Sequence, residues 1–455
     1  MRLPEQMEKV GYFWLPEDTK QQLPGTLRIS DSGEIALEVI GSFGDPIDQL
    51  NDQPSLGRIV GIIENGDLVT LDSCRYTQRN ISFGGVSKSL IHASLALLGA
   101  HYDKDEPITF SRVKFSVEGL DQWLSISGIR VTRNWETKSA TIKYDPPQEL
   151  LFSLPDNISL AFTFSWTLPS ERNPTEAKVT QKAYVSLESK DLRPFDFFSS
   201  IIFKLTNLFC FAIDDTVTLD SVTGFSYELK KEMSGGDTYE VPIKLYYQSL
   251  PFSEVKPKLD WDRMLFRYGH IKNDFERIIT NWLTNYDVSN PAFNLYFASK
   301  SGGYRYLEGR FLSLAQGVET LHRRNSSETL MPVDRYNEIA TQLVAACPAE
   351  SKGWLENRLK YGNELSLRAR LKQILAPFHR FFGNAGQRKC LVSKIIDTRN
   401  YLTHYDPRLV SSAAEGEELW KICRKLECLF QLHFLRLVGL SDQDIDKLEI
   451  GRAHV

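Results

Sequence analysis

The stretch LPFSEVKPKLDW (residues 250–261) separates two parts of the chain that have different hydrophobic patterns. Before it, runs such as GTLRISDSGEIALEVIG (residues 25–41) and RIVGIIENGDLVTLDSC (residues 58–74) are rich in β-branched residues and broken by turn signals. After it, apolar residues recur mostly at three- and four-residue steps, the period of an amphipathic helix. The sequence therefore predicts an α+β multidomain protein, in which a β-rich, sandwich or barrel-like N-terminal region precedes an all-α helical bundle.

The same patterns give a division into three segments. We expect a β-rich regulatory or sensor region at residues 1–255, a helical connector at 256–300 and a helical domain at 301–445. In the helical part, the periodicity predicts helices over residues 304–324, 334–346, 363–382, 388–404 and 415–437. Residues 87–98 fit either a short helix or a buried strand, and periodicity does not decide between them.

Bulk composition is that of an ordinary globular protein. The 455 residues carry a formal net charge of −4, so any nucleic-acid binding requires a local concentration of positive charge. The six cysteines show no zinc-ligand spacing, and we expect buried, reduced thiols in a cytoplasmic protein. The N-terminus lacks the apolar core of a signal peptide, and the apolar segment at residues 195–213 contains polar residues that predict protein core and no membrane contact.

The segment SKIIDTRNYLTHYDP (residues 393–407) carries the clearest chemical signal. His404 can accept or donate a proton near neutral pH, and Arg399 can hold a phosphate through its planar guanidinium. Together they suffice for RNA cleavage without a metal, if the imidazole transfers a proton and the guanidinium stabilises charge on the phosphorane. Asn400 can orient the imidazole or bond a phosphate oxygen.

Helical geometry separates these three residues. Asn400 and His404, four positions apart, share a face. Leu391, Ile395 and Leu402 lie roughly opposite, so we expect His404 to point outward. Arg399 lies about 140° from His404 on a regular helix. Either the helix is irregular there, or a second copy of the chain completes the site.

Two alternatives remain open at this point. The spacing of an arginine and a histidine occurs a second time, in Arg263 and His270, although their neighbours resemble packing residues. The segment around Arg399 and His404 also fits a surface helix with ion pairs to the nearby Asp397 and Asp406.

Positive charge is concentrated on the N-terminal side of this segment. Residues 350–400 contain eleven basic and four acidic residues, a local charge of +7 in a chain of net −4. His379, which lies among aromatic residues in APFHRFF, is more typical of a packed residue than of a catalyst. The predicted RNA-binding residues are Arg368, Arg370, Lys372, Arg380, Arg388 and Lys389.

The C-terminal half resembles HEPN domains, helical bundles of which many are ribonucleases, because RNYLTH (residues 399–404) fits their pattern of arginine and histidine separated by four to six residues. The earlier stretch YLEGRFLSLAQGVETLHRR resembles the first long HEPN helix, which implies Glu319 as an acidic helper in the site. The N-terminal half resembles ApeA-type proteins in VTLDSC, SLALLGAHYD and FSRVKFSVEGLDQWL, where Phe115, Leu120 and Trp123 also fit core packing.

The resemblance implies a bacterial anti-phage defence protein acting by abortive infection. It also implies RNA cleavage without metal or cofactor, with tRNA anticodon loops as a recurring substrate, and a site shared across a dimer. We therefore expect an endoribonuclease with RNA as substrate, a phage-derived trigger as partner, and the β-rich region as sensor. The alternative is a non-catalytic helical module for dimerisation or binding, with a β-rich domain that senses a ligand or phage protein.

Overall fold

The computed structural model describes residues 1–3, 5–43, 55–80, 85–170, 175–232, 236–302 and 304–448. These residues form two compact units, Met1–Thr280 and Asn281–Val455. The predicted order of a β-rich region followed by helices is confirmed. The division between the units lies within helix α4 (Phe275–Lys300), inside the segment 256–300 that was predicted as a helical connector.

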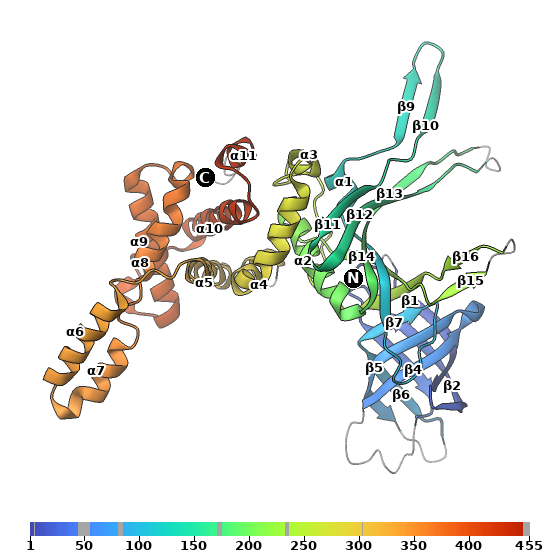
Figure 1. The fold of residues 1–455 in the computed structure, drawn as a ribbon, viewed down its shortest axis with the longest axis horizontal. Coiled ribbons are helices and arrows are strands. Elements are labelled where there is room, and N and C mark those ends of the chain that lie inside the picture. Colours follow the sequence, from blue (N-terminus) through green and yellow to red (C-terminus); the bar gives the residue numbers. More distant parts are fainter. Residues whose placement is uncertain are drawn as a thin grey trace. The chain divides into compact units, whose positions relative to one another are not determined.

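The N-terminal part of unit 1 is a closed β-barrel (Figure 1). Neighbouring strands pair antiparallel in the order β1-β2-β3-β6-β5-β4, and pairing of β4 with β1 closes the circuit. Alternating buried and exposed residues, as in β3, place one face of each strand inside the barrel. Residues 87–98, left undecided by periodicity, form strands β6 and β7. The barrel strands are β1 (Met7–Leu15), β2 (Asp18–Ile29), β3 (Ile35–Ile40), β4 (Ser55–Ile63), β5 (Leu68–Asn80) and β6 (Lys88–Ala93).

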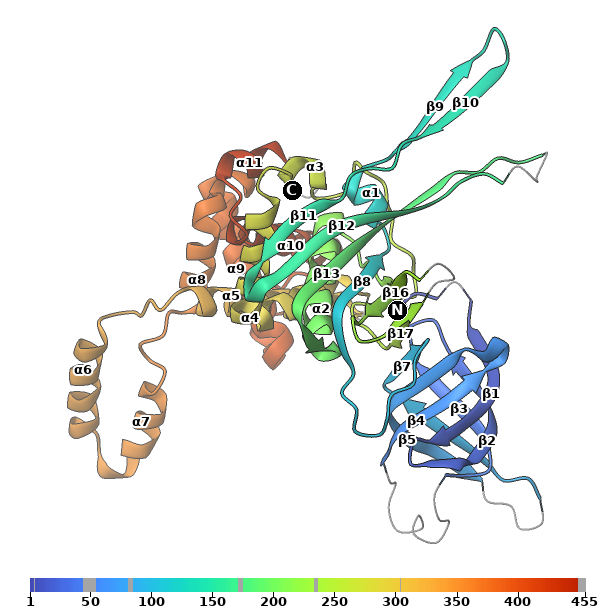
Figure 2. The same cartoon turned by 45° about the vertical axis from the view of Figure 1, so that its right-hand side comes forward.

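A second, open sheet continues from the barrel, because β5 also pairs with β7. Its order is β11-β12-β13-β8-β14-β17-β7. Two further hairpins, β9–β10 and β15–β16, form small separate ribbons, and the first projects from the sheet in both views (Figure 1, Figure 2). The remaining strands are β7 (Leu95–Leu98), β8 (Thr109–Val117), β9 (Ile129–Asn134), β10 (Ser139–Tyr144), β11 (Leu150–Leu154), β12 (Ile158–Thr167), β13 (Thr180–Pro194), β14 (Leu219–Phe225), β15 (Lys230–Glu232), β16 (Thr238–Glu240) and β17 (Ile243–Tyr247).

Helix α2 (Phe195–Ile213) packs on β8 and β13 of the open sheet. It is long and apolar enough to cross a membrane, but 61% of its most apolar window is buried inside the protein. This agrees with the prediction that the segment is protein core. Most of the described cysteines are buried, as expected, whereas Cys390 is exposed and contradicts that expectation.

Trp123, in the short helix α1 (Leu120–Leu124), explains why unit 1 extends beyond residue 255. Its ring contacts Phe209, Tyr268 and Phe275, with centroids 5.2, 6.0 and 6.1 Å away. Its indole N–H donates to the carbonyl of Phe266 at 3.0 Å. The residues after 255, including α3 (Tyr268–Ile271), therefore complete the core of the β-rich unit.

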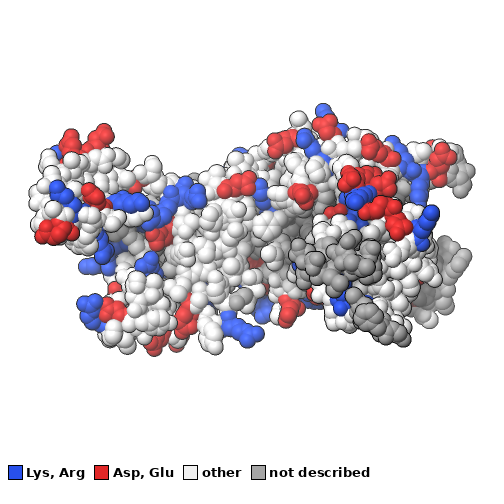
Figure 3. Space-filling view, turned by 90° about the horizontal axis from the view of Figure 1, so that it is seen from below, with Lys and Arg blue, Asp and Glu red and all other residues white. Residues whose placement is uncertain are grey.

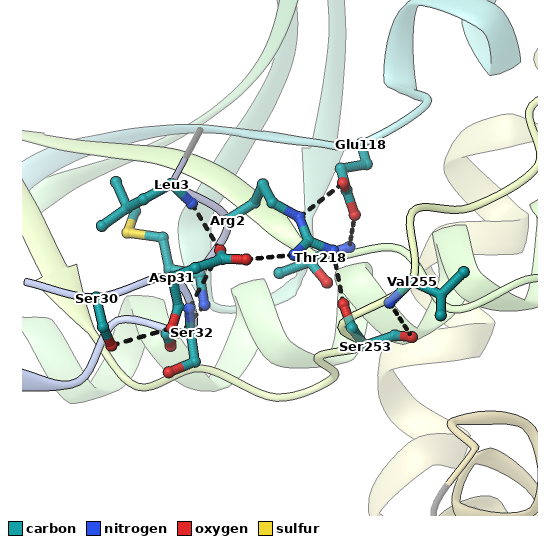
Figure 4. Close-up of polar contacts among 10 residues, drawn as sticks. Arg2, Leu3, Ser30, Asp31, Ser32, Glu118, Thr218, Ser253 and Val255 are labelled. Atoms are coloured by element: carbon teal, nitrogen blue, oxygen red, sulfur yellow. Dashed lines mark hydrogen bonds and ion pairs between the residues drawn. The ribbon is translucent and has the colours of Figure 1, made fainter. Parts of the chain in front are cut away.

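Arg2 joins three segments of unit 1 that are distant in sequence (Figure 4). Its guanidinium donates to Asp31 at 2.6 Å, to Glu118 at 3.0 Å and to the carbonyl of Ser253 at 2.6 Å. The Met1 ammonium donates to the carbonyl of Ser32, and burial lowers the pKa of that ammonium to about 6. This partly buried network fixes the turn after β2 against the end of β8.

Unit 2 is helical, and its core forms where α4, α5 and α10 meet. Phe293 of α4 lies 4.3 Å from Phe434 of α10, measured between ring centroids. A Cβ added to Gly317 of α5 would lie 2.6 Å from the ring of Phe430, so the glycine permits close helix packing. The helices are α5 (Leu307–Asn325), α6 (Val333–Ala346), α7 (Lys352–Leu359), α8 (Leu367–Leu375), α9 (Ala385–His404), α10 (Gly416–Leu437) and α11 (Asp442–Lys447).

The predicted helix at 363–382 is shorter than expected. Helix α8 begins after Ser366, whose hydroxyl accepts from the N–H of Ala369, and it gives way to a 3₁₀ segment, η4 (Ala376–Phe381). Pro377 explains this end, because proline lacks the N–H that a helix requires. Helices α6 and α7, of which α7 was not predicted, form a hairpin without buried residues that projects from the other helices of this unit (Figure 1, Figure 2).

Candidate functional site

Helix α9 carries the predicted catalytic residues. It begins at a capping box, in which Asn384 and Gln387 each accept from the other's backbone N–H. It ends at His404, because Tyr405 adopts a left-handed conformation with φ of 51°. Val392, Ile395 and Thr398 form its buried face. Ile395 was predicted there, whereas Leu391 and Leu402 are only half-buried.

Arg399 is half-buried and lines a pocket of about 470 Å³ between α5 and α9, together with Glu319, Arg323 and Thr403. Its guanidinium donates to Oδ1 of Asn400 at 3.2 Å. Within the described part of the chain Arg399 forms no ion pair, so the predicted alternative of pairs with Asp397 and Asp406 is not observed for this side chain. The charge of Arg399 is therefore available to an anion in this pocket.

Glu319 lies in the same pocket but its carboxylate is engaged. It accepts from Arg323 at 3.0 and 3.2 Å, and Arg323 also pairs with Glu364. These interactions raise the pKa of Arg323, although burial opposes them as the largest single influence. Glu319 is thus placed to hold Arg323 beside Arg399, and a proton-transfer role would require breaking that ion pair.

His404 is exposed, as the sequence predicted, and does not line the pocket that contains Arg399. Helix α9 is continuous from Ala385 to His404, so Arg399 and His404 are separated by the expected angle of about 140° around its axis. The structure therefore brings Arg399 together with Glu319 and Asn400, and leaves His404 on a different face of the same helix. Next to it, the rings of Tyr401 and the 70% exposed Tyr405 meet edge to face.

Four of the predicted RNA-binding residues gather around a second pocket, which we call the α8–α9 basic pocket. It has a volume of about 560 Å³ and lies between α8, η4 and the first half of α9. Lys and Arg side chains, with some acidic ones among them, gather over the part of unit 2 that contains α6 to α9 (Figure 3). The polar residues that line the pocket are Arg368, Lys372, His379, Arg388 and Lys389.

The other two predicted RNA-binding residues do not line this pocket. Arg370 is 5% exposed and donates to the carbonyl of Leu365 and to Nδ1 of His322, so it is a structural residue. Arg380 pairs with Asp446 at 3.0 Å and lies over the ring of Phe381. Local charge density in the sequence did not reveal which cations pair in the fold.

His379 was missed, because its aromatic neighbours predicted a packed side chain. In the structure it is exposed and lines the α8–α9 basic pocket. Its Nδ1 donates to the carbonyl of Ala376 at 3.1 Å. The sequence signal that could have found it is Pro377, which lacks an amide N–H and therefore indicates that the regular helix ends before His379.

The second arginine–histidine pair does not form a comparable site. Arg263 is exposed and pairs with Asp260 at 3.3 Å. His270 accepts at Nδ1 from the N–H of Arg267, and burial lowers its pKa. Across the described ranges, no group of three or more His, Cys, Asp or Glu side chains is arranged to hold a metal ion.

Comparison with protein families agrees with this division of the chain. A family model described as ApeA N-terminal domain 1 matches residues 8–282, and one described as Apea-like HEPN matches residues 312–444. No curated protein and no solved structure gave a match. The helical unit is thus a HEPN domain, a class generally associated with ribonuclease activity. The chain belongs to the ApeA-like proteins with a C-terminal HEPN domain, a family that indicates a nuclease-type module of anti-phage defence.

Proposed function

We propose that the protein is a metal-independent endoribonuclease that acts in abortive infection, and that its active sites are assembled from the α9 helices of two copies of the chain. The observation that carries this proposal is the placement of Arg399, Asn400 and His404 on the last turns of one HEPN helix. The remaining steps follow from the chemistry of these groups.

The proposed reaction is an internal displacement at an RNA phosphate. The imidazole of His404 takes the proton of a 2′-hydroxyl, whose oxygen then attacks the adjacent phosphorus. The bond to the 5′-oxygen breaks, that oxygen takes a proton from water, and the His404 imidazolium returns its proton to the resulting hydroxide. The products are a 2′,3′-cyclic phosphate and a free 5′-hydroxyl. Arg399 stabilises the negative charge on the phosphorane, and Asn400 keeps its guanidinium oriented through their 3.2 Å hydrogen bond.

The two-copy arrangement is proposed because one helix does not present both groups to one phosphate. Arg399 lies in the pocket beside α5, whereas His404 lies outside that pocket on an exposed face. A two-fold dimer places two copies of α9 in equivalent positions, so that Arg399 of one copy can serve His404 of the other. Each chain then contributes half of each site.

The test is cleavage of a mixed RNA pool by the purified full-length chain in EDTA, with product ends identified by sequencing. We expect His404→Ala and Arg399→Ala to lose at least about a hundredfold in rate. Arg335→Ala is the matched control, because Arg335 is an exposed arginine on α6 that pairs with Glu338. Cleavage that persists in either active-site variant would remove the assignment. A tRNA preference is tested in the same assay with isolated anticodon stem-loops.

The divergence of Arg399 and His404 within one chain also favours a second candidate, a non-catalytic HEPN module that dimerises or binds a partner. In that case the β-rich unit would sense a ligand or a phage protein. This candidate is supported if RNA remains intact at every protein concentration tested while the chain still binds RNA or a second protein.

A further inference from the structure

The α8–α9 basic pocket has cations without a counter-charge. Arg368, Lys372, Arg388 and Lys389 line it together with His379, and no carboxylate is among the described lining residues. Like charges around one cavity repel each other and cost stability. Most of these side chains are exposed, so solvent screens part of the repulsion, and an anion bound in the cavity would offset the rest.

Both arginines are held in position by neutral acceptors. Arg368 of α8 donates to the hydroxyl of Ser393 on α9 at 3.0 Å. Arg388 donates to the carbonyl of Gly383 and, at 3.4 Å, to that of His379. The guanidinium groups are therefore oriented while their charge remains uncompensated. This is the preorganisation that a phosphate-binding site needs.

The lysines and the first turn of α9 add to this field. Lys372 and Lys389 have no acidic partner within the described residues. Ala385, the first residue of α9, also lines the pocket. The capping box engages the N–H of Gln387 and not those of Ala385 and Gly386, and the N-terminal end of a helix carries a partial positive charge.

The pocket has an apolar part as well as a charged one. Leu375, Ala376 and Val392 supply this surface. Its volume of about 560 Å³ lies in the range of small-molecule sites. The Nδ1–H of His379 is bound to a carbonyl, so its Nε2 is the ring atom left to meet a ligand. A phosphate together with a planar, partly apolar group matches this lining, whereas inorganic phosphate uses only the cations.

We propose that the α8–α9 basic pocket is a nucleotide-binding site, in which the cations hold a phosphate and the apolar surface takes the base. We take this nucleotide to be part of an RNA strand, and that part of the proposal rests on the proposed function. Lys389 lies about 60° around α9 from His404 and about 22 Å along it. A nucleotide bound in the pocket is therefore remote from the cleaved phosphate. Its binding positions the RNA strand relative to His404.

The experiment measures binding of a 2′-O-methyl oligoribonucleotide, which lacks the attacking hydroxyl, to the full-length chain by fluorescence anisotropy. The variant is Lys372→Gln/Lys389→Gln. We expect it to weaken binding at least about tenfold and to reduce the slope of log K against log salt by about 1.4. The control, Lys421→Gln/Lys447→Gln, removes two exposed lysines from helices outside the pocket. It is expected to change affinity less than about twofold.

Two further probes distinguish the source of the nucleotide. Saturable binding of adenosine 5′-monophosphate that the double variant abolishes shows that the pocket also takes a free nucleotide. Binding of the oligonucleotide alone assigns the pocket to RNA. Equal affinity for inorganic phosphate and the mononucleotide would overturn the role of the apolar surface.

Unchanged binding of both nucleotide probes by the double variant would overturn the proposal as a whole. Parallel cleavage assays keep this failure separate from that of the proposed function. Intact cleavage with unaltered binding rejects only the pocket, and pocket-dependent binding without cleavage rejects only the nuclease.

Discussion

His433 of α10 should make the helical unit less stable in mild acid. Its Nε2 donates to the carbonyl of Ile374 at 2.9 Å, and its ring meets Phe378 edge-on at 4.9 Å. The pKa of His433 is lowered to about 4, mainly by loss of hydration on burial and to a smaller extent by the positive charges of Arg436 and His322. The folded state therefore disfavours the protonated ring.

The magnitude follows from the difference between the folded and unfolded pKa values. A histidine in the unfolded chain has a pKa of about 6.5, so this contribution to stability is fully present above that pH and is lost as pH falls toward 4. At pH 5, His433 is protonated in the unfolded chain and mostly neutral in the folded chain. This pH lies about 1.5 units below the pKa of the unfolded histidine. At about 1.36 kcal/mol per unit this costs about 2 kcal/mol. Because the His433 side chain is half-buried, we expect about 1–2 kcal/mol.

The assay is urea unfolding of the full-length chain between pH 8 and pH 5, for wild type and His433→Gln. Glutamine keeps a donor for the carbonyl of Ile374 but does not titrate. The difference in unfolding free energy between the two proteins should therefore change by about 1–2 kcal/mol over this interval. A difference that stays constant within about 0.5 kcal/mol would refute the burial of a neutral imidazole at this position.

Three further substitutions test the buried polar groups. Glu427, 1% exposed, pairs with two arginines of the helical unit, so Glu427→Ala should lower its unfolding free energy by about 3–5 kcal/mol in urea titrations. Arg2→Met should destabilise the β-rich unit by about 3 kcal/mol in calorimetry, whereas Arg263→Met, which removes an exposed ion pair, should cost less than about 1 kcal/mol. Arg370→Met should lower the thermal midpoint of the helical unit without weakening RNA binding by the folded protein, and a selective loss of RNA affinity would contradict its structural role.

Much of the architecture could be predicted from the sequence, because local signals and tertiary structure agree there. The change of period after residue 250 predicted β-strands before helices. Helix α9 was placed to its last residue, and the 100° step per residue correctly predicted an exposed His404. Its start was set three residues late, because Asn384 and Gln387 were not recognised as a capping box.

Other features depend on contacts between distant segments, which a single sequence does not contain. The pairing of β4 with β1 closes the barrel, and the packing of Phe275 against Trp123 extends unit 1 beyond its last strand. Burial of Arg370 depends on the position of His322, 48 residues earlier in the chain. The angular separation of Arg399 from His404 was predictable, whereas the pocket that receives Arg399 required the placement of α5.

Complementation between two inactive variants tests the central claim most directly. His404→Ala and Arg399→Ala chains are co-expressed with different tags, and the mixed dimer is isolated through both tags. In a site shared across two copies, the mixed dimer has one site with both wild-type residues and one with neither, so it should recover about half of the wild-type rate of RNA cleavage. A mixed dimer as inactive as either variant alone would show that Arg399 and His404 do not act across the interface, and would contradict the account.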